Sequence, residues 1–317
     1  MTSPFDQLQF GPFLDIAAAS ASGANPENQD NVLLIDSTGM AQFLDNQQVC
    51  RQQVHGWPGG HARVAVLDGM GGHGQGREAT EAVVAGLLAL PACSTLEQLS
   101  EALDVLHERL QAHFSVSVSP GRRPGTTLTL LELRPAQPAL VYHVGDSRLY
   151  KIRDGAATPL TVDHVPATAY AMTGLLEEAE WWRQVHAEHR SQISQAFILG
   201  NAFANPAQLS DPLFALSALN LPAYLAHIPD RRALELDPDA VYVLATDGFW
   251  ACEKPAAWLA RWPQLLDIRR GAYAMCTTLF DEMESRPPPG LRPDNLSAIV
   301  LRSRPPEETA LPGHIGL

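Results

Sequence analysis

Residues 63–77 read RVAVLDGMGGHGQGR, which combines the pattern of a buried strand with that of a glycine-rich loop. Arg63 to Leu67 is apolar except for the arginine and rich in β-branched residues, as expected of a strand. Asp68 follows, and after the glycines a segment with helical spacing extends from Arg77 to Leu90. The plain interpretation is a flexible turn. A nucleotide-binding loop is excluded, because its lysine is absent and Asp68 would repel phosphate. Since glycines let backbone carbonyls approach an ion closely, the stretch also predicts a cation site.

Three more aspartates occupy comparable places. Asp247 follows the apolar run Val241–Thr246, whereas Asp30 and Asp294 each lead into another apolar run. One such aspartate is usually a turn or cap residue. Several carboxylates at one rim would need cations to offset their mutual repulsion, and an all-oxygen ligand set favours Mg²⁺ or Mn²⁺ over zinc.

The remaining apolar runs indicate an α+β protein. Strands separated by turn-sized gaps, such as 134–138, favour antiparallel hairpins over repeated βαβ units. Residues 37–61 and 201–230 have the composition of insertions or linkers, and residues 302–317 that of a loose tail. Strands are predicted at 32–35, 63–67, 126–133, 139–144, 241–246 and 297–301, and helices at 77–90, 96–114, 175–199 and about 265–283.

The composition restricts the classes of partner. Asp and Glu number 35 against 22 Lys and Arg, and the net charge of −13 opposes binding to nucleic acid or anionic lipid. The four cysteines form no CxxC pair, so neither a zinc site nor a disulfide framework is expected. The longest apolar run, Ala82 to Leu90, is too short to span a bilayer. We therefore expect a cytoplasmic protein without membrane insertion.

The ordered motifs resemble those of PPM-type, or type-2C, metal-dependent serine/threonine protein phosphatases in their bacterial form. The resemblance covers about residues 20–301 and implies one catalytic domain over residues 1–301. It also implies a four-layer α/β/β/α sandwich, in which helices flank a central antiparallel β-sandwich, with an insertion at about 37–61 and a flap region at about 165–230. The matching stretches are NQD (28–30), DGMGG (68–72), GTT (125–127), GDSR (145–148), LTVDH (160–164), ATDGFW (245–250) and PDN (293–295).

The resemblance also implies roles for individual residues. Asp68 would bridge two tightly bound Mn²⁺ or Mg²⁺ ions, and Asp247 and Asp294 would complete the catalytic set. Asp163 would pair with Asp247 at a third, weaker metal site. The GDSR motif is interpreted as a structural turn with internal hydrogen bonds. The implied metal ligands are Asp30, Asp68, Gly69, Asp163, Asp247 and Asp294.

The activity implied is hydrolysis of phosphoserine and phosphothreonine monoesters by a metal-activated water, without a phosphoenzyme. Phosphorylated proteins would be the substrates, and a serine/threonine kinase would oppose the enzyme. One departure leaves an alternative open, because Asn25 stands where the family has a phosphate-binding arginine, and an amide cannot replace that clamp. The alternative is a phosphoprotein-binding pseudophosphatase that retains its metal site. Otherwise a nearby arginine fills the place, with Arg77, Arg122 and Arg123 as the candidates.

Some conspicuous residues have plainer interpretations. Trp181 and Trp182 are expected to be core or interface residues on a helix rather than parts of a substrate cage. His186 and His189 have helical spacing but no third nitrogen or sulfur ligand, which favours a helix surface or cap over zinc. Met70 stands where animal members have a general-acid histidine, so water or His73 would protonate the leaving group.

Overall fold

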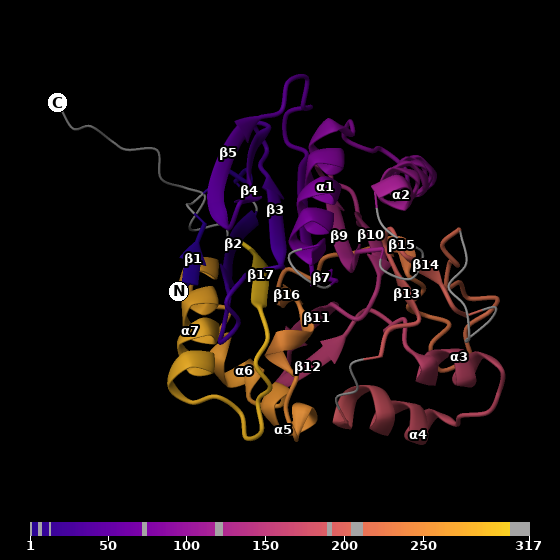
Figure 1. Cartoon of the computed structure of the whole chain (residues 1–317). Coiled ribbons are helices and arrows are strands. Elements are labelled where there is room, and N and C mark those ends of the chain that lie inside the picture. Colours follow the sequence, from indigo (N-terminus) through magenta and orange to yellow (C-terminus); the bar gives the residue numbers. More distant parts are fainter. Residues whose placement is uncertain are drawn as a thin grey trace.

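Two antiparallel sheets lie face to face at the centre of the molecule (Figure 1). The computed structural model describes residues 2–5, 8–12, 14–71, 75–117, 123–188, 192–203 and 212–304. The six-stranded sheet has the order β1 (Thr2–Pro4), β2 (Leu14–Ala21), β17 (Leu296–Ser303), β16 (Val241–Ala245), β11 (Arg148–Arg153) and β12 (Ala156–Pro159). The seven-stranded sheet has the order β15 (Arg231–Leu234), β10 (Ala139–Val144), β9 (Leu128–Leu133), β6 (Ala62–Leu67), β3 (Asn31–Ile35), β4 (Met40–Asp45) and β5 (Gln48–Gln53).

The central strands are apolar throughout because both of their faces are buried. Along β3, Val32 and Leu34 pack into the core between the two sheets, whereas Leu33 and Ile35 pack toward the helices outside. Successive side chains of a strand point to opposite faces, so a strand covered on both sides loses the usual polar alternation. This is why these strands could be predicted from short continuous apolar runs.

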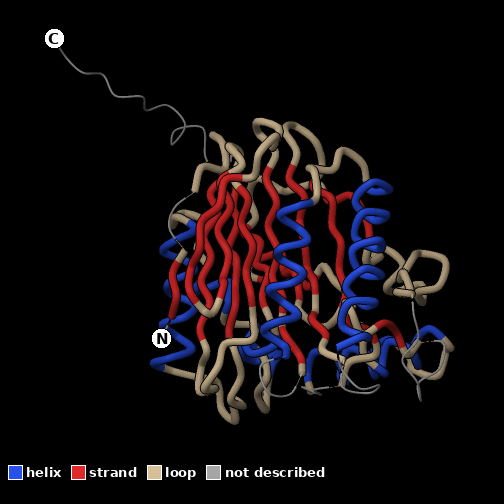
Figure 2. Tube along the Cα trace, turned by 45° about the horizontal axis from the view of Figure 1, so that its top comes forward, coloured by secondary structure: helices blue, strands red, loops and turns tan. Residues whose placement is uncertain are grey.

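Helices cover the outer face of each sheet (Figure 2). The seven-stranded sheet carries α1 (Gln75–Ala89) and α2 (Leu96–Ser117), and the six-stranded sheet carries α5 (Pro255–Leu259), α6 (Trp262–Leu265) and α7 (Ala272–Ser285). The predicted α+β class and the α/β/β/α layering are therefore confirmed.

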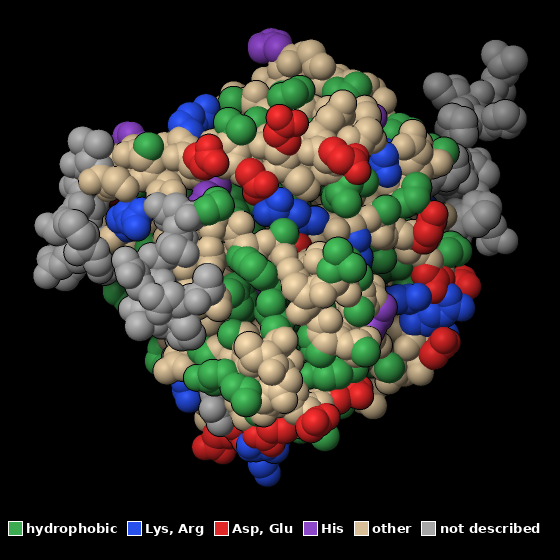
Figure 3. Space-filling view, turned by 90° about the vertical axis from the view of Figure 1, so that its right-hand side faces the viewer, with side chains coloured by type: hydrophobic (Ala, Val, Ile, Leu, Met, Phe, Trp, Pro, Cys, Tyr) green, Lys and Arg blue, Asp and Glu red, His purple; other side chains and the backbone are tan. Residues whose placement is uncertain are grey.

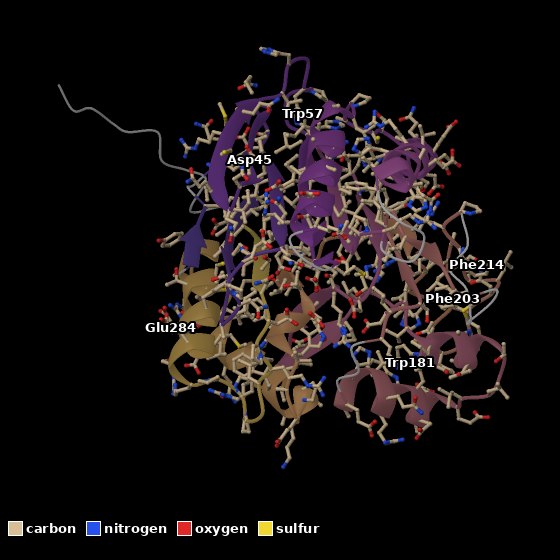
Figure 4. All side chains as sticks on the ribbon, in the orientation of Figure 1. Asp45, Trp57, Trp181, Phe203, Phe214 and Glu284 are labelled. Atoms are coloured by element: carbon tan, nitrogen blue, oxygen red, sulfur yellow. The ribbon has the colours of Figure 1, made fainter. Side chains whose placement is uncertain are left out.

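The flap region has a small hydrophobic core of its own, on the right of Figure 1. It contains α3 (Pro166–Met172), α4 (Glu178–Trp182), the π-helix η1 (Arg183–Ala187), β13 (Gln195–Ala196) and β14 (Gly200–Asn201). Trp181 is fully buried there, and its Nε1 donates to Thr168 Oγ1 at 3.1 Å, as expected for a core residue. Figure 4 shows Trp181 on the same side of the molecule as Phe203 and Phe214, whose rings are 5.9 Å apart.

Three sequence predictions of the fold are wrong. Residues 37–61 are not an insertion, because β4 and the edge strand β5 of the seven-stranded sheet lie within them, and the exposed polar side chains of β5 resemble those of a loop. The helix predicted over 175–199 ends in the π-helix at Ala187, and Gln195 is already in a strand. The tail does not begin at Arg302, because β17 continues to Ser303 and Arg302 is buried. Residues 305–317 lie outside the described part.

None of the described helices is both long enough and apolar enough to cross a membrane. On the face seen in Figure 3, Lys and Arg side chains lie in small separate groups among acidic ones.

Candidate metal centre

The strand register brings the ends of neighbouring strands to one rim of the sandwich. Asn31 at the start of β3 lies opposite Leu67 at the end of β6, so Asp30 and Asp68 meet at the same edge. In the other sheet, Ala245 at the end of β16 lies opposite Ala298 in β17. Asp247 and Asp294 therefore also reach this edge, which lies near the β7, β11 and β16 labels in Figure 1.

A fifth aspartate, Asp146, joins this group. Arg148 at the start of β11 lies opposite Ala245, which places Asp146 at the same rim. The negative charge of Asp146 raises the pKa of both Asp68 and Asp247, so it is electrostatically part of the site. The sequence prediction for GDSR missed it. The available signal was the same one that marked the other aspartates, namely an acidic residue beside a glycine at a strand end.

Burial and mutual repulsion both disfavour ionisation of these side chains. Burial raises the pKa of Asp30, Asp68 and Asp247 well above the usual range, and the neighbouring carboxylates raise it further. Burial, with the charge of Asp163 next, raises the pKa of Asp146 to about 7, and burial raises that of Asp294. These five aspartates can all be ionised together only when a positive charge is bound among them.

The donor set fits a hard divalent cation. The rim offers oxygen donors, which Mg²⁺ and Mn²⁺ prefer. Gly69, in β7 (Gly69–Met70), lets the backbone at Gln29 and Gly76 pack closely against the segment after Asp68. A Cβ at Gly69 would lie 2.4 Å from the carbonyl oxygen of Gln29 and 2.5 Å from that of Gly76. Within the described residues, no three His, Cys, Asp or Glu side chains already have the spacing of an assembled site. Asp68 and Asp247 instead share a hydrogen bond with each other.

Hydroxyl side chains hold the rim from behind. Thr246 Oγ1 donates to Asp30 Oδ2 at 2.8 Å. The backbone N–H of Asp68 donates to Thr127 Oγ1 at 2.9 Å, and that hydroxyl lies 2.7 Å from Ser147 Oγ. The GTT and GDSR motifs therefore brace the strand end that carries Asp68.

Asn295 connects the two sheets at this rim. Its Nδ2 donates to the carbonyl oxygens of Ser22 at 3.0 Å and Glu27 at 2.9 Å, and its Oδ1 accepts from the backbone N–H of Gln29. A Cβ at Gly248 would lie only 2.0 Å from the Asn295 carbonyl oxygen, so this glycine is required by packing. These contacts explain why the NQD, TDG and PDN stretches occur together. Each stretch supplies one carboxylate to the rim, and the contacts of Asn295 and Gly248 hold the three stretches against one another.

Asp163, the residue predicted for the third metal site, is held by an arginine. Arg148 Nε lies 2.9 Å from Asp163 Oδ1 and Arg148 Nη2 lies 2.7 Å from Asp163 Oδ2, in a pair whose side chains are only 2% and 4% exposed. Arg148 also donates to Tyr150 Oη and to the Val185 carbonyl, and it stacks on the ring of Trp250. Both oxygens of Asp163 are therefore bound to a guanidinium. The internal hydrogen bonds predicted for GDSR are present at its arginine.

The described arginines suggested for the place of Asn25 already have partners within the protein. Arg77 Nε is 2.7 Å from Glu27 Oε1 and its Nη1 is 3.0 Å from Glu81 Oε1, so Arg77 is already paired. Arg123 Nη1 lies 3.5 Å from Ser115 Oγ. Arg122 lies outside the described residues, as do His73 and His189.

His186 is not on a helix surface, contrary to prediction. It is buried in the π-helix, with its ring 4.3 Å from that of Trp182, and burial lowers its pKa well below the usual value. Its role in the described structure is packing within the flap.

Known proteins share this sequence pattern and this fold. The family model described as Protein phosphatase 2C matches residues 41–282. The serine/threonine protein phosphatase PstP of Mycobacterium tuberculosis is 37% identical over 105 residues, which are 32% of this chain and 20% of PstP. The match thus covers only a small part of the length of that relative.

Solved structures support the same fold at low sequence identity. The serine/threonine phosphatase of S. agalactiae superposes with a TM-score of 0.62 at 20% identity, covering 92% of this chain and 100% of that one. The catalytic domain of PstP in complex with two manganese ions has a TM-score of 0.56 at 21% identity, covering 92% and 99%. The family match covers well over half of the 317 residues, and the chain therefore belongs to the protein phosphatase 2C family.

Proposed function

We propose that this protein is a metal-dependent protein serine/threonine phosphatase. The observation that carries the proposal is the convergence of Asp30, Asp68, Asp146, Asp247 and Asp294 at one rim, where each carboxylate is disfavoured without a cation. Family membership supplies the reaction class, which is hydrolysis of phosphoserine and phosphothreonine monoesters.

The residues at the rim have distinct roles in this mechanism. Asp68, the Gly69 carbonyl, Asp247 and Asp294 would hold two Mn²⁺ or Mg²⁺ ions, which when bound activate a water for in-line attack on phosphorus and offset charge in the transition state. Asp30, held by Thr246, would orient water beside them. Because water is the nucleophile, no side chain need be phosphorylated. For a third, weaker ion we propose Asp146 with Asp247, in place of Asp163.

We infer that the substrates are phosphorylated proteins and that a serine/threonine kinase opposes the enzyme. The support is family membership. A cytoplasmic location is proposed because all four cysteines are free thiols, three of them buried, as expected in a reducing compartment. One catalytic domain is proposed for residues 1–303, because both sheets share a single core between them.

The test is hydrolysis of p-nitrophenyl phosphate and of a phosphothreonine peptide, with Mn²⁺ and with EDTA. We expect turnover with Mn²⁺ that EDTA abolishes and that Asp68→Asn reduces to below about a tenth of the wild-type kcat. Asp154→Asn is the matched control, because Asp154 lies at the far end of β11 and its side chain is 87% exposed. Binding of Mn²⁺ without turnover would reject the enzyme and favour the pseudophosphatase.

A further inference from the structure

We propose that Arg292 is the cation that binds the phosphate group of the substrate. The inference rests on the proposed function and assigns to the same site a residue that lies outside its recognised motifs. A phosphate monoester carries roughly two negative charges near pH 7, and a guanidinium can bind two of its oxygens at once.

Arg292 borders a cavity that is continuous with the carboxylate rim. The cavity has a volume of about 400 Å³ and lies between α7 and the segments that precede β3 and β17. Asp294 and Gly248, the neighbour of Asp247, form one part of its wall. Ala24, next to Asn25, forms another. A group bound in this cavity would therefore lie beside the carboxylates and any cations that they hold.

The backbone of Arg292 is anchored, while its side chain is free. Its N–H donates to the Ala251 carbonyl at 2.8 Å, Pro293 follows, and Asp294 Oδ1 accepts from the N–H of Asn295. The side chain is exposed, and among the described residues it forms no hydrogen bond or ion pair. A guanidinium that is fixed at its base and unpaired at its tip can bind a ligand without first breaking an ion pair within the protein.

The other arginines near the rim are not available to bind a phosphate group. Arg77 is paired with two glutamates, and Arg148 is buried against Asp163. Glu284 on α7, which Figure 4 labels, also lines the cavity, but it forms no ion pair with Arg292. Among the described arginines put forward for this place, none lines this cavity, whereas Arg292 does, and its side chain has no partner within the described part of the protein.

The decisive experiment measures phosphate binding and turnover in the same variants. We expect Arg292→Ala to weaken the affinity of the Mn²⁺-loaded protein for inorganic phosphate, measured by calorimetry, by about 10- to 100-fold. The KM for p-nitrophenyl phosphate should rise by a similar factor, with kcat within about threefold of wild type. Arg292→Lys should give an intermediate loss of phosphate affinity, because lysine keeps the positive charge but lacks the planar guanidinium that can bind two phosphate oxygens at once.

Two further variants separate this role from a general charge effect. Arg269→Ala removes an equal charge from a side chain that is 86% exposed and pairs with Asp267, and it should leave both constants unchanged. In the Arg292→Ala background, Asn25→Arg should restore phosphate affinity, since Asn25 directly follows Ala24, which lies in the wall of the same cavity.

Equal phosphate affinity in wild type and Arg292→Ala, to within about twofold, would overturn the assignment even if the wild type is an active phosphatase. Conversely, phosphate binding that depends on Arg292 in a protein without metal-dependent turnover would reject the proposed function and retain the assignment. A wild-type protein that neither binds phosphate nor hydrolyses the ester would overturn both.

Discussion

Replacing Asp163 with asparagine should destabilise the fold without removing a tightly bound metal ion. In the native protein, Arg148 and Asp163 form a two-pronged ion pair with almost no solvent exposure. Burial raises the pKa of Asp163 despite its cationic partner, so the contact offsets only part of the cost of desolvation. For Arg148, burial acts to lower the pKa, but Asp163 and Tyr150 raise it above its usual value.

The magnitude follows from what remains after the substitution. Arg148 would keep its hydrogen bonds to Tyr150 and Val185 and its contact with the ring of Trp250, but it would lose the carboxylate of its two-pronged ion pair. Removing one member of a buried ion pair typically costs about 3–5 kcal/mol, because the other charge stays buried. We expect a loss of this size in the free energy of unfolding.

The assay is urea unfolding in EDTA together with a count of bound Mn²⁺ by calorimetry. Asp163→Asn should be less stable and still bind two ions, and Arg148→Met in the same chain should recover part of the stability, since it removes the unpaired charge. Asp154→Asn is the control, because its exposed contact with Arg153 should be worth less than about 1 kcal/mol. Unchanged unfolding combined with loss of a tightly bound ion would show that Asp163 is a ligand after all.

Four further outcomes are expected. Asp68→Asn should abolish Mn²⁺-dependent turnover while thermal unfolding in EDTA shows no loss of stability, because one repelling carboxylate is gone; a destabilised metal-free protein would contradict this. Asp146→Asn should lower kcat with two ions still bound, and loss of a tightly bound ion by calorimetry would move Asp146 to the primary site. Burial raises the pKa of Asp230 from 3.8 to about 7, so the folded state favours the protonated form and stability falls as pH rises from about 4 through 7. Asp230→Asn should therefore gain stability relative to wild type at pH 8 compared with pH 5 in urea unfolding, and an equal difference at both pH values would refute it. Ending the chain at Leu301 should lower the melting temperature, because Arg302 is buried in β17 with its Nε 3.0 Å from Asp15 Oδ2, and an unchanged melting temperature would mean that this strand end contributes nothing.

The accuracy of the fold prediction depended on burial. The runs at 32–35, 139–144 and 241–246 were identified because strands buried on both faces are continuously apolar. β5 was missed because most of its side chains are exposed at the sheet edge, which gives it the composition of a loop. The helix predicted over 175–199 failed because its apolar residues belong to two different cores: Trp181 and Val185 pack within the flap, whereas Phe197 and Ile198 pack in the core beneath α1 and α2.

For the site, local sequence determined which strand ends carry Asp30, Asp68, Asp247 and Asp294, because an acidic residue beside glycine or asparagine at the end of an apolar run is a local pattern. Local sequence did not determine which side chains form ion pairs with residues from distant parts of the chain. Only the folded structure shows that Arg148 binds Asp163 and leaves Asp146 at the rim. The free guanidinium of Arg292 likewise becomes significant only when α7 and two distant loops enclose one cavity beside Asp294. Pairing and availability of charge depend on distances between segments far apart in sequence, and those distances are set by the packing of the two sheets.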